Sequence, residues 1–112
     1  MKTIRTLMLL TMIGMVGTAW AQPLKILCDS DPPAQFIGAD GQLTGYTVEL
    51  VRDIQKRVGN DDPISIVPWA RGYEMIRHQP NVVLFLMAHT PERASQFKWV
   101  GPVLELEFGF YQ

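Results

Sequence analysis

The chain has 112 residues, and its 10 Lys and Arg against 11 Asp and Glu give a formal net charge of −1. No basic face is available to hold a phosphate backbone, so we exclude nucleic acid as a partner. Beyond the first 21 residues about ninety remain, which is enough for one modest core and too few for two domains.

The first 21 residues have the pattern of a cleavable export signal. Lys2 and Arg5 form a basic start, residues 7–16 form an apolar run, and residues 19–21 (Ala-Trp-Ala) match the small-x-small cleavage site. The apolar run is shorter than the roughly 20 residues that a spanning helix needs, and an uncleaved membrane anchor is the alternative. We expect a signal peptide over residues 1–21, removed after Ala21.

The first elements after this signal are a strand over residues 24–29 and a small hairpin. Apolar side chains alternate along the strand, and two consecutive prolines then require a loop. The hairpin joins residues 36–37 to residues 42–43 through a glycine-rich turn. Cys28 is the single cysteine, so no internal disulfide can form. We interpret it as a buried strand residue rather than a lipid attachment site.

A helix is predicted over residues 48–58. Thr47 can cap its start, and Gly59 stands where a left-handed cap would end it. Apolar residues recur along it at three- and four-residue spacing, which predicts one buried stripe made of Leu50, Val51, Ile54 and Val58.

Strands and helices continue to alternate through the rest of the chain. A strand over residues 64–67 leads to a short helix over residues 70–78, and the apolar run of residues 82–87 predicts a strand covered on both faces. This order predicts an α/β fold with a mostly parallel sheet flanked by helices. Residues 104–110 alternate like a last strand that nothing covers, so we expect residues 22–112 to be an incomplete part of a longer protein.

The segment after the apolar strand has the signals of a helix start. Thr90 can cap free N–H groups, Pro91 suits the first helical position, and Glu92 suits the positive helix end. Arg93 then places a guanidinium beside that end, which predicts a receptor for a carboxylate. His89 can donate to an anion there or remain a solvated loop residue. The segment therefore favours binding of a small anionic or zwitterionic solute.

Further candidates stand at the ends of the other strands. Trp69 suits either an aromatic wall for a ligand or a core position, and Arg71 and Tyr73 can face the same cleft. Asp29 and Asp31 put two acids on one face of an extended segment, and Asp31 is the candidate for a ligand amine. Two carboxylates do not make a metal site, so we expect no metal. Because the sequence has no catalytic triad, zinc spacing or Walker loop, we expect no cofactor and no enzyme.

Four motifs occur in order along the chain. They are Asp-Pro-Pro-Ala-Gln-Phe at residues 31–36, Gly-x-x-x-Gly-Tyr-x-Val-Glu-Leu at residues 41–50, Pro-Trp-Ala-Arg at residues 68–71, and Thr-Pro-Glu-Arg at residues 90–93, followed by Phe97. Together they resemble the N-terminal lobe of bacterial extracellular solute-binding proteins of family 3, which have the type II periplasmic binding fold. The resemblance covers nearly all of the chain beyond the signal.

The resemblance implies a periplasmic, two-lobed protein that closes on a small polar or anionic solute, with the first lobe alone in this chain. It also implies delivery to an inner-membrane ABC permease, and we expect a monomer. In amino-acid-binding relatives the arginine that matches Arg93 pairs with the α-carboxylate, and aromatic residues that match Phe36 and Trp69 pack on the solute. This chain departs from them at Ala88, where they carry a hydroxyl, and at Ala34, where they carry an aromatic ring.

Three alternative functions remain open at this point. The same fold serves as the sensing module of some sensor kinases, and it occurs in lytic transglycosylase-type enzymes. The third alternative is a truncated lobe without function. A membrane span or a catalytic domain after the solute-binding part would distinguish the first two from a transport protein.

Overall fold

The computed structural model describes residues 22–105 and Gly109. Its main sheet has three parallel strands, with β1 (Lys25–Cys28) in the centre between β4 (Ile64–Ile66) and β5 (Val82–Leu84). Because the strands are parallel, their carboxyl ends meet at one edge, which we call the carboxyl edge. The predicted α/β class and the predicted parallel sheet are confirmed.

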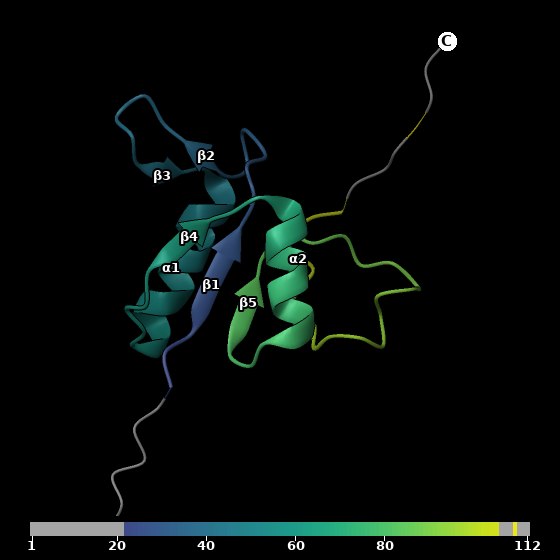
Figure 1. Cartoon of the computed structure of the whole chain (residues 1–112). Helices are drawn as coiled ribbons and strands as arrows, with labels where there is room; N and C mark the ends of the chain where they lie inside the picture. The colour runs from purple at the N-terminus through teal and green to yellow at the C-terminus, as the bar shows by residue number, and fades with distance from the viewer. Residues whose placement is uncertain (1–21, 106–108, 110–112) are drawn as a thin grey trace, which may run out of the picture.

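Two helices cover opposite faces of this sheet. α1 (Tyr46–Val58) lies on the connection from β1 to β4, and α2 (Trp69–His78) joins β4 to β5. The two connections run in opposite directions across the sheet, so right-handed crossovers place the helices on opposite faces. Figure 1 shows α2 in front of the sheet and α1 behind it.

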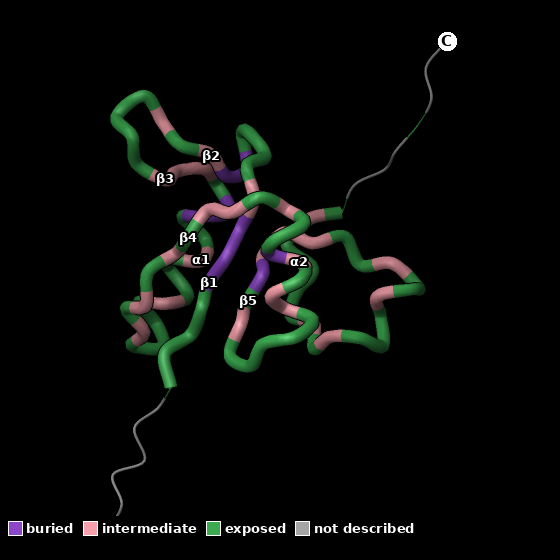
Figure 2. The backbone as a smooth tube through the Cα atoms, viewed as in Figure 1, coloured by how far each residue is buried: buried purple, intermediate pink, exposed green. Residues whose placement is uncertain are grey.

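The core is centred on β1. Ile26, Leu27 and Cys28 are buried there, together with Val48 of α1 and Leu84 of β5. Figure 2 shows the same concentration of buried backbone along β1. The interpretation of Cys28 as a buried strand residue is confirmed, since its exposed fraction is 0 %.

Helix α1 has the predicted end and a different start. Gly59 adopts the left-handed conformation with φ of 71°, as predicted. The prediction that Thr47 caps the helix is wrong, because Gly45 is the N-cap and Thr47 lies buried inside the first turn. Its hydroxyl bonds to the preceding loop instead of to the helix.

The predicted apolar stripe of α1 is largely exposed. Leu50, Ile54 and Val58 are 41, 48 and 70 % exposed, and Val48 in the first turn faces the core instead. The strands are three or four residues long, whereas the helix has 13. A helix rises about 1.5 Å per residue and a strand about 3.3 Å, so α1 extends well past the sheet that could cover it.

The predicted hairpin is present as β2 (Phe36–Ile37) paired antiparallel with β3 (Leu43–Thr44). Its turn is closed by the Gly38 N–H, which donates to the Gln42 carbonyl at 2.8 Å, and Gly41 supplies a φ of 77°. Residues other than glycine rarely adopt such a φ.

The segment after α2 differs most from the prediction. The strand β5 ends at Leu84, before Leu86 with its φ of 61°, so it is shorter than residues 82–87. Within the described residues it is covered on one face only, since Leu84 is buried and Val83 is 40 % exposed.

Residues 91–96 form turns, so the predicted capped helix at this place is wrong. The Thr90 carbonyl accepts from the N–H groups of Arg93 and Ala94 at 3.0 and 2.9 Å. Few residues remain before Phe97 packs on the Tyr73 ring, and so short a segment cannot offset the cost of starting a helix.

Some predictions lie outside the described residues. These are the signal peptide over residues 1–21 and most of the last strand, although Leu104, which is described, is not in a strand. Within residues 22–105 no helix is long and apolar enough to cross a membrane.

Candidate functional site

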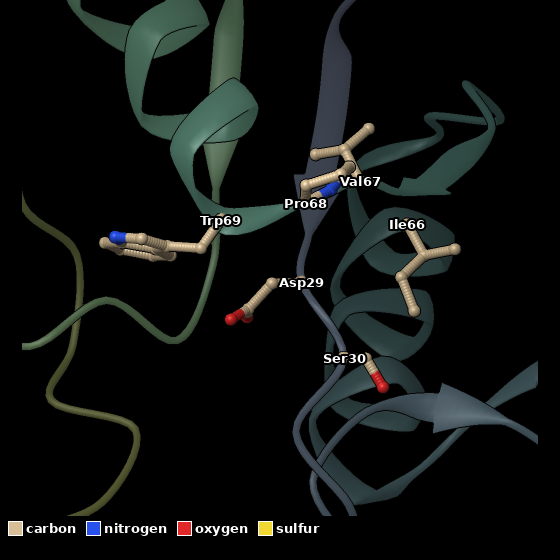
Figure 3. A pocket seen from close by; sticks show the side chains of 6 residues that line it. All are labelled: Asp29, Ser30, Ile66, Val67, Pro68 and Trp69. Atoms are coloured by element: carbon tan, nitrogen blue, oxygen red, sulfur yellow. The ribbon is translucent and has the colours of Figure 1, made fainter.

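An open pocket of about 440 Å³ lies at the carboxyl edge, between the ends of β1 and β4. Figure 3 shows the residues that line it, which are Asp29, Ser30, Ile66, Val67, Pro68 and Trp69. The N–H of Val67 donates to the Cys28 carbonyl at 2.8 Å and keeps the two strand ends together. Pro68 then ends the extended segment and begins α2, which places Trp69 at the pocket.

An aromatic cluster extends from Trp69 away from the pocket. The Trp69 and Tyr73 rings are stacked with centres 5.8 Å apart, because the two residues lie one turn apart on α2. Phe97 meets Tyr73 edge-on at 5.9 Å, and Trp99 meets Phe97 at 6.0 Å. These contacts hold residues 88–99 against α2.

Arg93 lies on this aromatic cluster, beside the wall of the pocket. Its guanidinium carbon is 5.5 Å from the centre of the Trp69 ring and 5.2 Å from that of Tyr73. Its Nη1 donates to the Ala88 carbonyl at 3.3 Å. The structure thus brings the two candidate residues Arg93 and Trp69 together, and aromatic faces hold the arginine where we expected a helix start.

Thr90 and His89 are not among the residues that line the pocket. The backbone N–H of Glu92 itself and the Thr90 hydroxyl bind the Glu92 carboxylate and lower its pKa. The His89 ring packs edge-on against Trp99 at 4.5 Å. Both residues therefore support the shape of the loop that carries Arg93.

Three other predicted site residues also stand away from the pocket. Asp31 is exposed, in a tight turn where its backbone pairs with that of Gln35. Phe36 is half-buried in the hairpin. Arg71 borders a second cavity of about 260 Å³ on the α2 side of the sheet. It lies two residues after Trp69 on α2, and side chains two residues apart on a helix point in different directions.

Asp29 and Ser30 line the pocket, whereas the sequence analysis preferred Asp31 to Asp29 as the acid for a ligand and gave Ser30 no role. Asp29 is half-buried and accepts a hydrogen bond from Gln35 Nε2 at 3.3 Å. The available signal was position, since Asp29 directly follows β1 and ligands of open α/β sheets bind beyond the strand ends. In the described part of the chain, no group of three or more His, Cys, Asp or Glu could hold a metal ion.

The pocket therefore combines a carboxylate, a hydroxyl and an indole wall around an open space, and a guanidinium that does not line the pocket contacts the indole. Such a set suits non-covalent binding of a small polar molecule. In comparison with known proteins, the family model of bacterial extracellular solute-binding proteins, family 3, matches residues 24–110. Neither the curated proteins nor the solved structures contain a match. Because the match spans most of its 112 residues, the chain belongs to the bacterial extracellular solute-binding proteins of family 3, and its general function is solute binding.

Proposed function

We propose that this protein is a periplasmic solute-binding component of an ABC-type importer, and that it binds a small polar or anionic, amino-acid-like solute at the carboxyl edge. Family membership supports solute binding, and an inner-membrane permease is the usual partner of such proteins. In this proposal residues 22–112 form the first of two lobes, act as a monomer, and reach the periplasm through the predicted signal. Binding and release make no covalent bond, so the proposal assigns no catalytic group.

The observation that carries this proposal is that Trp69 lines the pocket and also contacts Arg93. Its indole lines the pocket, and the guanidinium carbon lies 5.5 Å from the ring centre. A guanidinium stacked on a ring keeps its N–H edge available for planar contact with a carboxylate. The contact from Arg93 Nη1 to the Ala88 carbonyl is long at 3.3 Å, so a carboxylate can replace it at little cost.

The remaining pocket residues suit the carbon skeleton of such a solute. Ile66, Val67 and Pro68 form an apolar wall next to the indole of Trp69. Ligand sites of this kind are mostly apolar, with a few polar groups that fix the orientation. This chain differs from amino-acid-binding relatives at Ala34 and Ala88, so the proposed class of solutes is wider than the α-amino acids.

Isothermal titration calorimetry of the full chain with the twenty L-amino acids, succinate and glutarate tests this function. We expect saturable binding of at least one of them. For that solute the Arg93→Gln variant should lose affinity by about 30-fold or more, because a desolvated charge-assisted pair contributes on the order of 2–5 kcal/mol.

Arg77→Gln is the matched control. Arg77 also lies on the Tyr73 ring, with its guanidinium carbon 5.7 Å from the ring centre, but it stands two turns along α2 from the pocket. The affinity of the Arg77→Gln variant for that solute should stay near that of the wild type. Equal losses in the two variants would indicate a general effect of charge, and an unchanged Arg93→Gln variant would remove the arginine from the site.

A further inference from the structure

The second cavity, which Arg71 borders, is a groove beside the strand β4, and we call it the β4 groove. Ser65 of β4 pairs with Leu27 of β1, and Leu27 pairs with Leu84 of β5, so the three side chains point to one face of the sheet. Because Leu84 contacts α2 at Gly72, this is the face on which α2 lies. The groove, of about 260 Å³, lies on the same face.

The position of α2 explains why space remains beside β4. α2 packs against β5 and β1, and Figure 1 shows it on the β5 side of the sheet. Gly72 lets the helix approach closely there, because a Cβ atom at this position would lie 3.2 Å from Leu84 Cδ1 and 3.2 Å from Val67 Cγ2. β4 stands at the end of the strand order β4-β1-β5, so the helix does not extend over it.

The β4 groove combines an apolar floor with a cationic border. Its lining residues are Leu24, Lys25, Ile26, Leu27, Pro63, Ser65, Val67, Arg71 and Met75. Among these described residues two are basic and none is acidic. Arg71 is exposed, and it forms no ion pair with any residue of the described part of the chain. The lining therefore favours a ligand that is both apolar and negatively charged.

The two ends of the β4 groove differ in charge. Pro63 precedes β4, so it lies at the amino end of the sheet. There the Asp62 carboxylate accepts from the backbone N–H of Leu24 at 2.9 Å. Arg71 lies in the first turn of α2, which begins at the carboxyl edge. An anionic group is repelled by Asp62 and attracted by Arg71, so its place is at the Arg71 end.

The side chains between these ends suit a hydrocarbon chain. Met75 stands one turn after Arg71 on the same face of α2, and its flexible thioether adapts to an irregular apolar ligand. Lys25 Nζ donates to Gln79 Oε1 at 2.8 Å, and Gln79 does not line the groove. The aliphatic stem of Lys25 therefore adds to the apolar lining.

We propose that the β4 groove is a second binding site, which takes a small aliphatic carboxylate with its charged end at Arg71 and its hydrocarbon chain along β4. This inference goes beyond the proposed function, because it concerns a different place in the molecule. Of the residues that line the carboxyl-edge pocket and the β4 groove in the described part of the chain, the two share Val67 alone.

A series of carboxylates tests this inference by calorimetry on the full chain at low ionic strength, where exposed charges are least screened. The series consists of butanoate, hexanoate and octanoate. We expect the affinity to rise about fourfold with each added CH₂ group that the groove buries, since burial of one such group contributes about 0.8 kcal/mol. Equal affinities along the series, or no binding of octanoate, would overturn the inference.

Three variants locate the binding of octanoate. Arg71→Gln should weaken it about fivefold, because an ion pair at an exposed guanidinium contributes up to about 1 kcal/mol. Ser65→Leu keeps the charges but fills the floor, so it should reduce the affinity for octanoate more than that for butanoate. Arg77→Gln is the matched control, since it removes another exposed arginine of α2 that does not line the groove. Equal losses in Arg71→Gln and Arg77→Gln would contradict the proposed site. Thermal melts check that each variant folds, and Ser65→Leu carries the test if Arg71→Gln does not fold.

Methyl NMR separates the β4 groove from the carboxyl-edge pocket. In carbon-13 spectra of methionine-labelled full chain, assigned with Met75→Leu, octanoate should shift the Met75 methyl signal and leave the Trp69 indole signal nearly constant. A shift of Trp69 with Met75 unmoved would assign octanoate to the carboxyl edge and overturn the inference. The proposed function is tested separately, with the amino acids and dicarboxylates of the calorimetric panel, so either result can fail without the other.

Discussion

Arg93 owes its position to the rings beneath it, 5.5 and 5.2 Å from its guanidinium carbon. The sequence indicates the residue through its Thr-Pro-Glu-Arg motif, but the predicted helix start is a run of turns. The rings of Trp69 and Tyr73 come from α2, and no local pattern around residue 93 could reveal that contact. The ligand-binding role of Arg93 stays a prediction, whereas the prediction of its surroundings was wrong.

Cys28 is a second residue whose surroundings have a measurable consequence. Its side chain is fully buried, and this burial, with a smaller effect from the Asp29 charge, raises the pKa of its thiol from 9.0 to about 11. The folded protein then holds the thiol proton more tightly than the unfolded chain does. Stability that is present below pH 9 is therefore lost as the pH rises towards 11.

We expect this loss to be smaller in a Cys28→Ala variant. Two pKa units correspond to about 2–3 kcal/mol, which the wild type should lose between these pH values in addition to what the variant loses. Urea unfolding of both proteins at a series of pH values measures the difference. Parallel curves for the two proteins would show that the thiol ionises equally in the folded and unfolded states.

At the scale of elements, periodicity and turn residues predicted the order and type of every helix and strand through β5. Two predictions about α1, its cap and its buried stripe, were wrong for physical reasons. The Thr47 hydroxyl finds partners in a loop that is distant along the chain, so a local capping rule could not describe it. The exposed stripe of α1 depends on how far the sheet extends, which no helical pattern contains.

Gly45 provides a test at the same scale. Its φ of 124° and the collision that a Cβ would make with Ala34 both oppose substitution. We expect Gly45→Ala to lower the free energy of unfolding by about 2–4 kcal/mol. It should also weaken solute binding, because Gln35, the residue after Ala34, donates a hydrogen bond to the pocket residue Asp29.

Gly41→Ala is the control for Gly45→Ala. Its φ of 77° is also unfavourable, but nothing lies within 4 Å of the added Cβ. The cost should be about 1 kcal/mol, with solute binding unchanged. Urea unfolding and calorimetry measure both variants, and similar losses in the two would show that close packing at Gly45 adds nothing.

At the scale of the whole molecule, the strand order β4-β1-β5 creates the site. It places the residues after β1 next to those after β4, and the loop that carries Arg93 follows β5. The sequence predicts a parallel sheet and a binding edge, since ligands bind beyond the strand ends. It could not select Asp29 over Asp31, because that choice depends on a tight turn and on the buried Gln35.

Two indole N–H groups report most directly on whether the carboxyl edge binds the solute. Trp69 lines the pocket, whereas Trp99 Nε1 already donates to the Ala94 carbonyl at 3.2 Å. Nitrogen-15 NMR spectra of the labelled full chain, assigned with Trp→Phe variants, can follow both groups while each panel solute is added. The account predicts a saturable shift of the Trp69 signal and a nearly constant Trp99 signal. A solute that binds by calorimetry but leaves Trp69 unmoved would contradict it.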